Sequence, residues 1–226
     1  MPTIGLRKPI IAPIVEEPGN APLTYGEAIK EDHAISASLA WTLSDATLYG
    51  DDILLEKDNA ILGGTLTFGL DGVSPALQVG ALGTAFTAGG TADDMDDPAA
   101  YFEDVDASGT PVGFGYIRVH RKAGVVTFEG NWLYKVQFGP SNEETNTRGE
   151  TIVFQTPSIV GTIMGVKIDD SGVSRFRRRQ KFSTEAAALA FIESCRSGTP
   201  APAPATDTIP QGVTPVAATT KKGTAE

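Results

Sequence analysis

Hydrophobic and polar residues alternate along several stretches of the chain. In the clearest single stretch, 35–43, the large apolar residues fall on one face: Ile35, Ala37, Leu39, Trp41 and Leu43. A period of two is typical of a half-buried β-strand. Similar patterns predict further strands over 62–70, 151–155, 159–168 and 173–182.

Residues 112–138 form the strongest local unit. One alternating run ends at Arg121, the turn sequence Lys122-Ala123-Gly124 follows, and a second run covers 128–138. Two such runs joined by a short turn predict an antiparallel β-hairpin. Gly113 and Gly115 lie in its first strand, where we interpret them as points of close packing or bending. The second strand carries one aromatic-rich face: Phe128, Gly130, Trp132, Tyr134, Val136 and Phe138.

Capping residues predict two helices. Ser74 followed by Pro75 is typical of a helix start, and Gly83 ends that short helix. A second helix has Ser183 as its N-cap and ends at Gly198. Apolar residues recur in it with helical spacing and predict one buried stripe: Ala188, Phe191, Ile192 and Cys195.

Proline, glycine and polar residues predict where the arm, the loops, the domain and the tail begin and end. Four prolines between residues 9 and 22 predict an N-terminal arm over 1–34 that lacks a regular central strand or helix, with room for a short strand at Ile10-Ile11. Loops are expected over 45–52 and, in an acidic Gly-rich stretch, over 84–110. The second loop has room for a short strand at 100–102. Pro, Ala and Thr dominate 198–226, which we expect to be a disordered tail. One β-rich domain, 35–197, lies between the arm and the tail.

The chain is acidic, with a formal net charge of −10. Surfaces that bind nucleic acid are normally basic, so this charge argues against a protein built to neutralise phosphates. The sequence has no signal-peptide pattern and no apolar run near the roughly 20 residues of a membrane-spanning helix. We therefore expect a protein made in the cytoplasm without membrane attachment.

No catalytic, metal-binding or cofactor-binding pattern is recognisable in the sequence. His33 and His120 have no acidic or hydroxyl partner suggested by sequence, and the single cysteine, Cys195, lies on an apolar stripe. Asp104 opens a stretch similar to a calcium-binding EF-hand loop, but Gly115 stands where that loop needs a bidentate Glu. We expect a solvated acidic loop, no cofactor and no enzymatic activity.

One basic run, 175–181, stands out in this acidic chain. Within a single strand, Arg175, Arg177 and Arg179 would share one face. Such a cationic strip suits either nucleic acid or a charge-complementary contact with another copy of the chain. The overall negative charge favours the contact between copies.

Several short motifs, in a fixed order along the chain, indicate a protein family. The strongest piece covers 115–122 and leads to 132–138, and the others cover 4–9, 34–37, 46–52, 63–67, 143–150 and 154–157. Together, over residues 4–195, they resemble the major tail proteins of long, non-contractile-tailed bacteriophages. Residues 198–226 lie outside the resemblance.

The resemblance implies a mainly β (α+β) fold, a β-sandwich or partly rolled barrel with a flanking C-terminal α-helix. It implies hexameric rings that stack into a tail tube, through which DNA passes without specific binding. The implied partners are further copies of the chain and other tail proteins, such as the tape measure and tail terminator proteins. The chain would be assembled in the host cytoplasm and would reside in the virion tail.

Candidate contact residues follow from the resemblance and the patterns together. The N-terminal arm, the loop around Leu48 and Tyr49, and the acidic loop 84–110 are candidates for contacts between rings. Leu48 and Tyr49 would pack either on a partner or on their own domain. Candidate contacts between subunits also include Arg175, Arg177 and Arg179, and candidate acidic-loop or lumen residues are Asp93, Asp94, Asp96 and Asp97.

A second hypothesis is a β-sandwich module that binds a ligand or carbohydrate. Exposed aromatic side chains on one face of a sheet would favour it.

Overall fold

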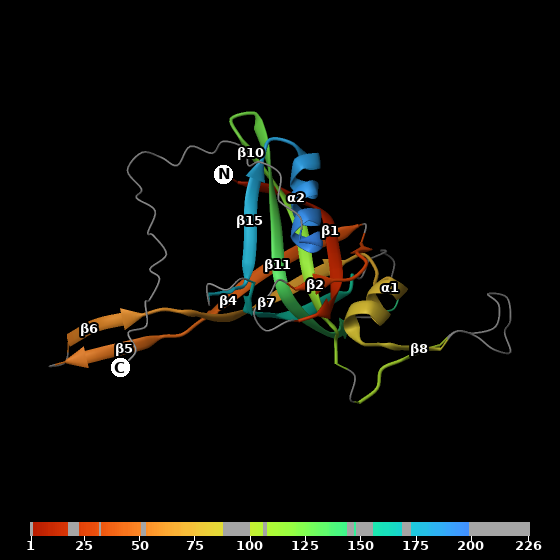
Figure 1. The fold of residues 1–226 in the computed structure, drawn as a ribbon, viewed down its shortest axis with the longest axis horizontal. Coiled ribbons are helices and arrows are strands. Elements are labelled where there is room, and N and C mark those ends of the chain that lie inside the picture. The colour runs from red at the N-terminus through yellow and green to blue at the C-terminus, as the bar shows by residue number, and fades with distance from the viewer. Residues whose placement is uncertain are drawn as a thin grey trace.

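The computed structural model describes residues 2–17, 23–31, 33–50, 53–87, 100–105, 108–143, 147, 156–168 and 173–198. These residues form a mainly β structure with a large antiparallel sheet and a flanking C-terminal helix (Figure 1), so the predicted fold class is confirmed. The elements in chain order are β1 (Thr3–Glu16), β2 (Thr24–Tyr25), β3 (Ile29–Lys30), β4 (Ala34–Leu43), β5 (Ala46–Gly50), β6 (Ile53–Asp58), β7 (Ile61–Leu70), α1 (Pro75–Leu77), the π-helix η1 (Gln78–Leu82), β8 (Ala85–Thr87), β9 (Ala100–Phe102), β10 (Pro111–Lys122), β11 (Val125–Asn142), β12 (Ser158–Met164), β13 (Val166–Lys167), β14 (Ser174–Arg175), β15 (Arg177–Phe182) and α2 (Glu185–Ser197).

Strand β11 is the centre of the main sheet. Neighbouring strands follow the order β2-β1-β10-β11-β12-β7-β4, while β3 pairs with β1 and β15 pairs with β11. One edge of β11 pairs with β10, and its other edge pairs first with β15 and then with β12. Strand β4, at the far end of this order, contacts β1. The sheet is therefore partly rolled.

Two hydrophobic clusters occupy the two faces of the β10–β11 hairpin. One cluster, which includes Phe68 and Phe114, lies inside the rolled sheet and beneath η1. The other, which includes Trp132 and Phe191, lies beneath helix α2. Residues 129–134 of β11 are buried without interruption, because the strand has packing partners on both faces. The hairpin is thus the middle layer of the domain.

The predicted single aromatic face of β11 is divided between these clusters. Trp132 and Tyr134 pack beneath α2, whereas Val136 and Phe138 enter the rolled core. The register between β10 and β11 shifts along this part of β11, between Leu133 and Val136. An extra residue at such a bulge reverses the alternation of faces, so the prediction of one continuous face is wrong.

The predicted hairpin turn is confirmed. Lys122 pairs with Val125, which leaves Ala123 and Gly124 as a two-residue turn with φ values of 48° and 83°. Two successive positive φ angles match the turn geometry whose twist suits a two-residue hairpin.

Both predicted helices are present, one of them with a different cap. The Ser74 hydroxyl oxygen accepts a hydrogen bond from the Leu77 amide at 3.2 Å, and Gly83 ends η1 at a φ of 79°. The N-cap of α2 is Thr184 rather than Ser183: its hydroxyl accepts from the Ala187 amide at 3.3 Å. Gly198 ends α2 as predicted.

The prediction that residues 1–34 lack a regular central strand is wrong, because β1 pairs with β10 over most of its length. Pro9 falls within a register shift between Arg7 and Ile10, where the ladder is already interrupted, and Lys8 has a φ of 48°. Pro13 lies near the end of the ladder with β10. A proline without an N–H is tolerated at such positions.

The prediction of a loop over 45–52 is wrong for residues 46–50, which form β5, and residues 51–52 lie outside the described residues. Strands β5 and β6 form a second hairpin, which Figure 1 shows extending away from the body of the domain. The Asp and Gly residues at 45 and 50–52 suggested a loop, but Thr47, Tyr49 and Ile53 are residue types that favour strands. Asp45 and Lys57 form an ion pair of 2.9 Å near the base of the hairpin.

The predicted acidic loop over 84–110 contains a short hairpin formed by strands β8 and β9. Strand β9 was expected at 100–102, but its partner β8 was not. Residues 88–99 and 106–107, the predicted strand over 151–155, and the tail after Gly198 lie outside the described residues.

Gly115 is expected to tolerate no side chain. A Cβ there would lie 2.5 Å from Ile192 Cγ2 and 2.7 Å from Trp132 Cε3, so Gly115→Ala should push α2 and Trp132 apart. Overpacking of this kind costs about 1–3 kcal/mol. Urea denaturation should show that loss in the free energy of unfolding. Gly5→Ala is the control, because nothing lies within 4 Å of its Cβ position; an equal effect of both substitutions would contradict the packing argument.

Candidate functional site

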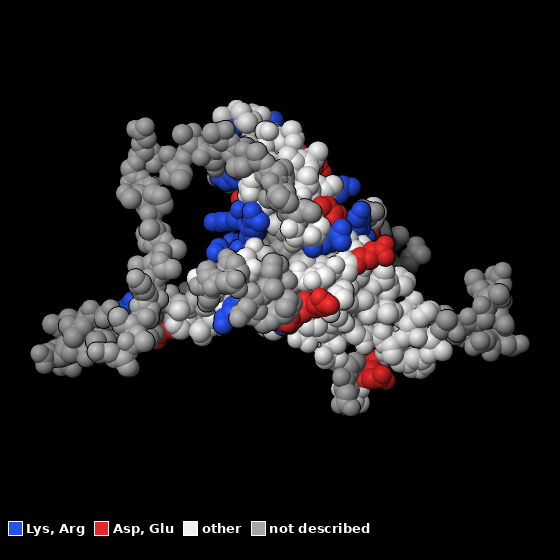
Figure 2. Space-filling model, viewed as in Figure 1, with Lys and Arg blue, Asp and Glu red and all other residues white. Residues whose placement is uncertain are grey.

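The basic run is split between two strands. Arg175 lies in β14, which pairs with β13, whereas Arg177 and Arg179 lie in β15, which pairs with β11. The chain bends between them at Phe176, whose ring packs edge-on against Trp41 with centroids 5.8 Å apart. The expectation of three arginines on one face of one strand is therefore wrong for Arg175. Figure 2 shows Lys and Arg side chains gathered over the side of the domain where β15 lies.

Strands β10, β11 and β15 align polar side chains on the face that is turned away from α2. Residues directly opposite each other in antiparallel strands share a face and lie close together. One cross-strand row contains Tyr116, Asn131 and Arg179, and the next contains Arg118, Glu129 and Lys181. We call Arg118, Arg177 and Arg179 the arginine cluster.

Arg177 is half-buried at the boundary between this polar face and the rolled core. Its guanidinium lies over the Trp41 ring, 5.4 Å from the ring centroid, in a cation–π contact. Burial lowers the pKa of Arg177, and the nearby charges of Arg179 and Arg118 act in the same direction. Arginine nevertheless stays protonated in proteins. Three positive charges therefore share one small area.

Glu129 is the one carboxylate in these rows, and it is 6% exposed. Its Oε1 lies 3.8 Å from Nη1 of Arg118, and its Oε2 lies 3.5 Å from Nε2 of His120. Sequence neighbours suggested no acidic partner for His120. The two-residue turn fixes the register of the hairpin, so counting outward from that turn would have paired Glu129 with Arg118 and placed it near His120.

Two buried oxygen atoms on this face have no hydrogen-bond donor. The amide nitrogen of Asn131, a fully buried residue, donates to the Glu129 backbone oxygen at 3.1 Å, while its Oδ1 has no partner. Oε1 of Glu129 also accepts no hydrogen bond. A buried acceptor without a donor costs about 1–3 kcal/mol. Among the described residues, the polar network of this face is thus incomplete.

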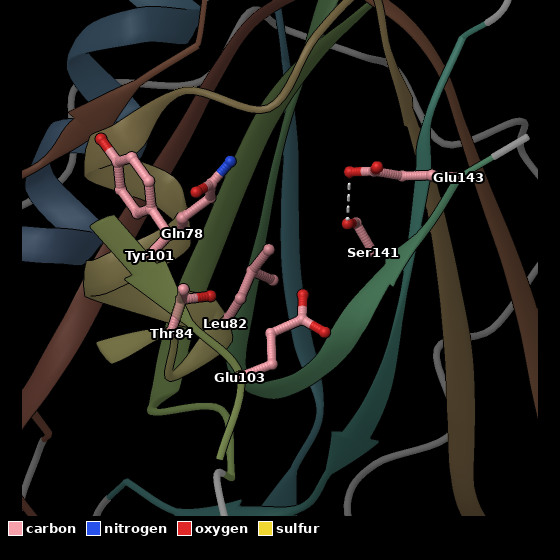
Figure 3. Close-up of a pocket in the computed structure, with 7 residues that line it drawn as sticks. All are labelled: Gln78, Leu82, Thr84, Tyr101, Glu103, Ser141 and Glu143. Atoms are coloured by element: carbon pink, nitrogen blue, oxygen red, sulfur yellow. Dashed lines mark hydrogen bonds between the residues drawn. The ribbon is translucent and has the colours of Figure 1, made fainter. Parts of the chain in front are cut away.

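A separate pocket of about 290 Å³ lies between η1, β9 and the end of β11. Figure 3 shows Glu103 and Glu143 reaching it from two different elements, with Tyr101 on a third side. Ser141 donates a hydrogen bond of 3.0 Å to Glu143. The remaining lining residues are Gln78, Leu82 and Thr84, so the described lining is acidic and polar and contains no Lys or Arg.

The other predicted contact residues do not join either site. Leu48 and Tyr49 lie in β5 on the extended hairpin, and their side chains are outside what the structure describes. Asp93, Asp94, Asp96 and Asp97 lie outside the described residues. His33 is an exposed residue with a φ of 67°, just before β4.

Among the described residues, no three His, Cys, Asp or Glu side chains lie close enough together to hold a metal ion. The second half of the EF-hand-like stretch enters β10, which starts at Pro111. Over all the residues that the structure describes, no helix is long and apolar enough to cross a membrane.

The chain matches no protein-family model and no curated protein sequence. The resemblance to phage tail proteins therefore stays a prediction.

Cys195 is expected to react slowly with alkylating reagents. It is half-buried beside Tyr25 and Tyr134, and burial raises the pKa of its thiol. The reactive thiolate is then a smaller fraction at pH 8 than in an unfolded chain. Mass spectrometry should show iodoacetamide labelling several-fold slower in the native protein than in urea. Equal rates in the two states would contradict this account.

Proposed function

We propose that this chain is a non-enzymatic structural subunit that assembles into stacked hexameric rings and forms the tail tube of a bacteriophage. The observation that carries the proposal is the β5–β6 hairpin, which extends away from the body (Figure 1). An isolated two-stranded hairpin is at best marginally stable in water. Such an arm is best explained by a neighbouring molecule against which it packs.

An open strand edge supports the same proposal. Strand β4 pairs with β7 alone, as far as the described strands extend. An exposed edge carries unpaired backbone groups that another chain can bind. A closed ring of identical copies would cover such edges in a controlled way.

The ring symmetry, the stacked tube and the passage of DNA come from the resemblance to phage tail proteins. The net charge of −10 supports a conduit for DNA rather than a DNA-binding protein, because an acidic wall repels phosphates. The proposed partners are further copies of the chain, the tape measure protein and the tail terminator protein. The proposed location is the virion tail, after assembly in the host cytoplasm.

A ligand- or carbohydrate-binding module is the second candidate. The exposed aromatic residues Phe86, Tyr101 and Phe102 on the β8–β9 hairpin favour it, since sugars commonly stack on such rings. Tyr101 also lines the acidic pocket of Figure 3. Binding to a glycan array by a chain that stays monomeric would favour this candidate over the tail tube.

Sedimentation velocity of the purified full chain tests the proposal. We expect a species of about six times the 23.7 kDa of one chain, or larger polymers, to grow with protein concentration. A monomer at every concentration, and also in the presence of the other tail proteins, would refute it.

Removing the extended hairpin should abolish assembly but preserve the fold. The Ser44 amide donates to the Ala60 backbone oxygen at 2.7 Å, so the two ends of the arm are adjacent. Replacing residues 45–59 with Asn-Gly therefore joins β4 and β7 through a favoured two-residue turn.

The shortened variant should unfold in urea within about 1 kcal/mol of the full chain, because an exposed hairpin adds little stability. It should sediment as a monomer under conditions where the full chain assembles. Assembly at the unchanged concentration would show that the hairpin makes no essential contact.

A further inference from the structure

The arginine cluster has many hydrogen-bond donors and few acceptors. A guanidinium carries five N–H donors. Arg118 donates to the Tyr116 hydroxyl at 3.3 Å and has Glu129 nearby. The side chains of Arg177 and Arg179 form no hydrogen bond or ion pair with any residue that the structure describes, although Arg177 contacts the Trp41 ring. The cluster therefore has an excess of positive charge and of unused donors.

The two oxygens without a hydrogen bond lie in the same rows as two of these arginines: Asn131 Oδ1 in the row of Arg179, and Glu129 Oε1 in the row of Arg118. A guanidinium that is fixed in position by an external anion can turn its remaining N–H groups toward them. One bound anion would thus reduce the repulsion between the arginines and also orient guanidinium N–H groups so that they donate to two buried acceptors.

We infer that the arginine cluster is a binding site for carboxylates of a second copy of the chain, and that these carboxylates are Glu103 and Glu143. The inference depends on the proposed self-assembly and identifies one of its contacts. Arg118 belongs to this site although the basic run in the sequence did not include it, whereas Arg175 does not.

The acidic pocket is the matching surface for reasons of charge and position. Glu103 and Glu143 form no ion pair with a described residue, and they open into one pocket of about 290 Å³ that is large enough for a guanidinium. Its Tyr101 ring offers a face on which a guanidinium can stack. Unlike a nucleic acid, a second copy brings isolated carboxylates rather than a continuous row of phosphates, which a chain of charge −10 repels.

The two surfaces lie on opposite sides of the domain, β15 on one side and β8 with η1 on the other (Figure 1). They therefore cannot meet within one chain. Two copies that join basic side to acidic side leave one free surface of each kind, so the contact repeats head to tail. Contacts of this type close into rings or continue as filaments.

A charge-exchange experiment tests the inference. Arg179→Glu alone and Glu143→Arg alone should each weaken self-association at least tenfold in sedimentation velocity, because like charges then face each other. A mixture of the two variants should recover association, since every contact in an alternating ring is again complementary. Arg121→Glu is the matched control: Arg121 is exposed at the end of β10 and should change association little.

The outcomes separate the inference from the proposed function. If the wild-type chain assembles but the two single variants assemble equally well, or the mixture is not rescued, the inference is wrong and the proposed function is unaffected. If the wild-type chain never assembles, both fail. Fluorescence anisotropy with a labelled oligothymidylate covers the remaining alternative: binding that is lost in Arg179→Glu would overturn the assignment to carboxylates.

Discussion

The structure depends on the burial of β11 from both sides. Its residues Trp132 and Leu133 point into different hydrophobic clusters, one beneath α2 and one inside the rolled sheet. Gly113 and Gly115 on β10 allow the Trp132 ring to lie directly against the backbone of that strand. Because β11 also pairs with β10, β12 and β15, it joins every layer of the domain. The same strand positions Asn131 and Glu129 between the arginines of β10 and β15.

The sequence predicted those elements whose signals are local. The β10–β11 hairpin follows from its alternation and its two-residue turn, and α2 follows from its cap and apolar stripe. Strand β1 was missed because Pro9 lies within a register shift, where a strand tolerates proline. No local pattern reveals such a shift, because it depends on the partner strand. The split of the basic run was missed for a similar reason, since Phe176 is held by Trp41, a residue far away in the sequence.

The candidate site shows how an acidic chain can still present a local positive surface. Arg177 is held in place by a neutral aromatic partner, Trp41, while Arg118 contacts both Tyr116 and the carboxylate of Glu129. An aromatic partner fixes a guanidinium without neutralising it, so the charge of Arg177 remains available to another molecule. The β5–β6 hairpin, which extends away from the body of the domain, is a second feature that a neighbouring copy could cover.

Negative-stain electron microscopy of the purified full chain, over a range of concentrations, tests the claim of self-assembly most directly. The account predicts hollow rings with sixfold symmetry, and stacks of such rings as the concentration rises. Compact particles of single-chain size at every concentration, with or without the other tail proteins, would contradict it.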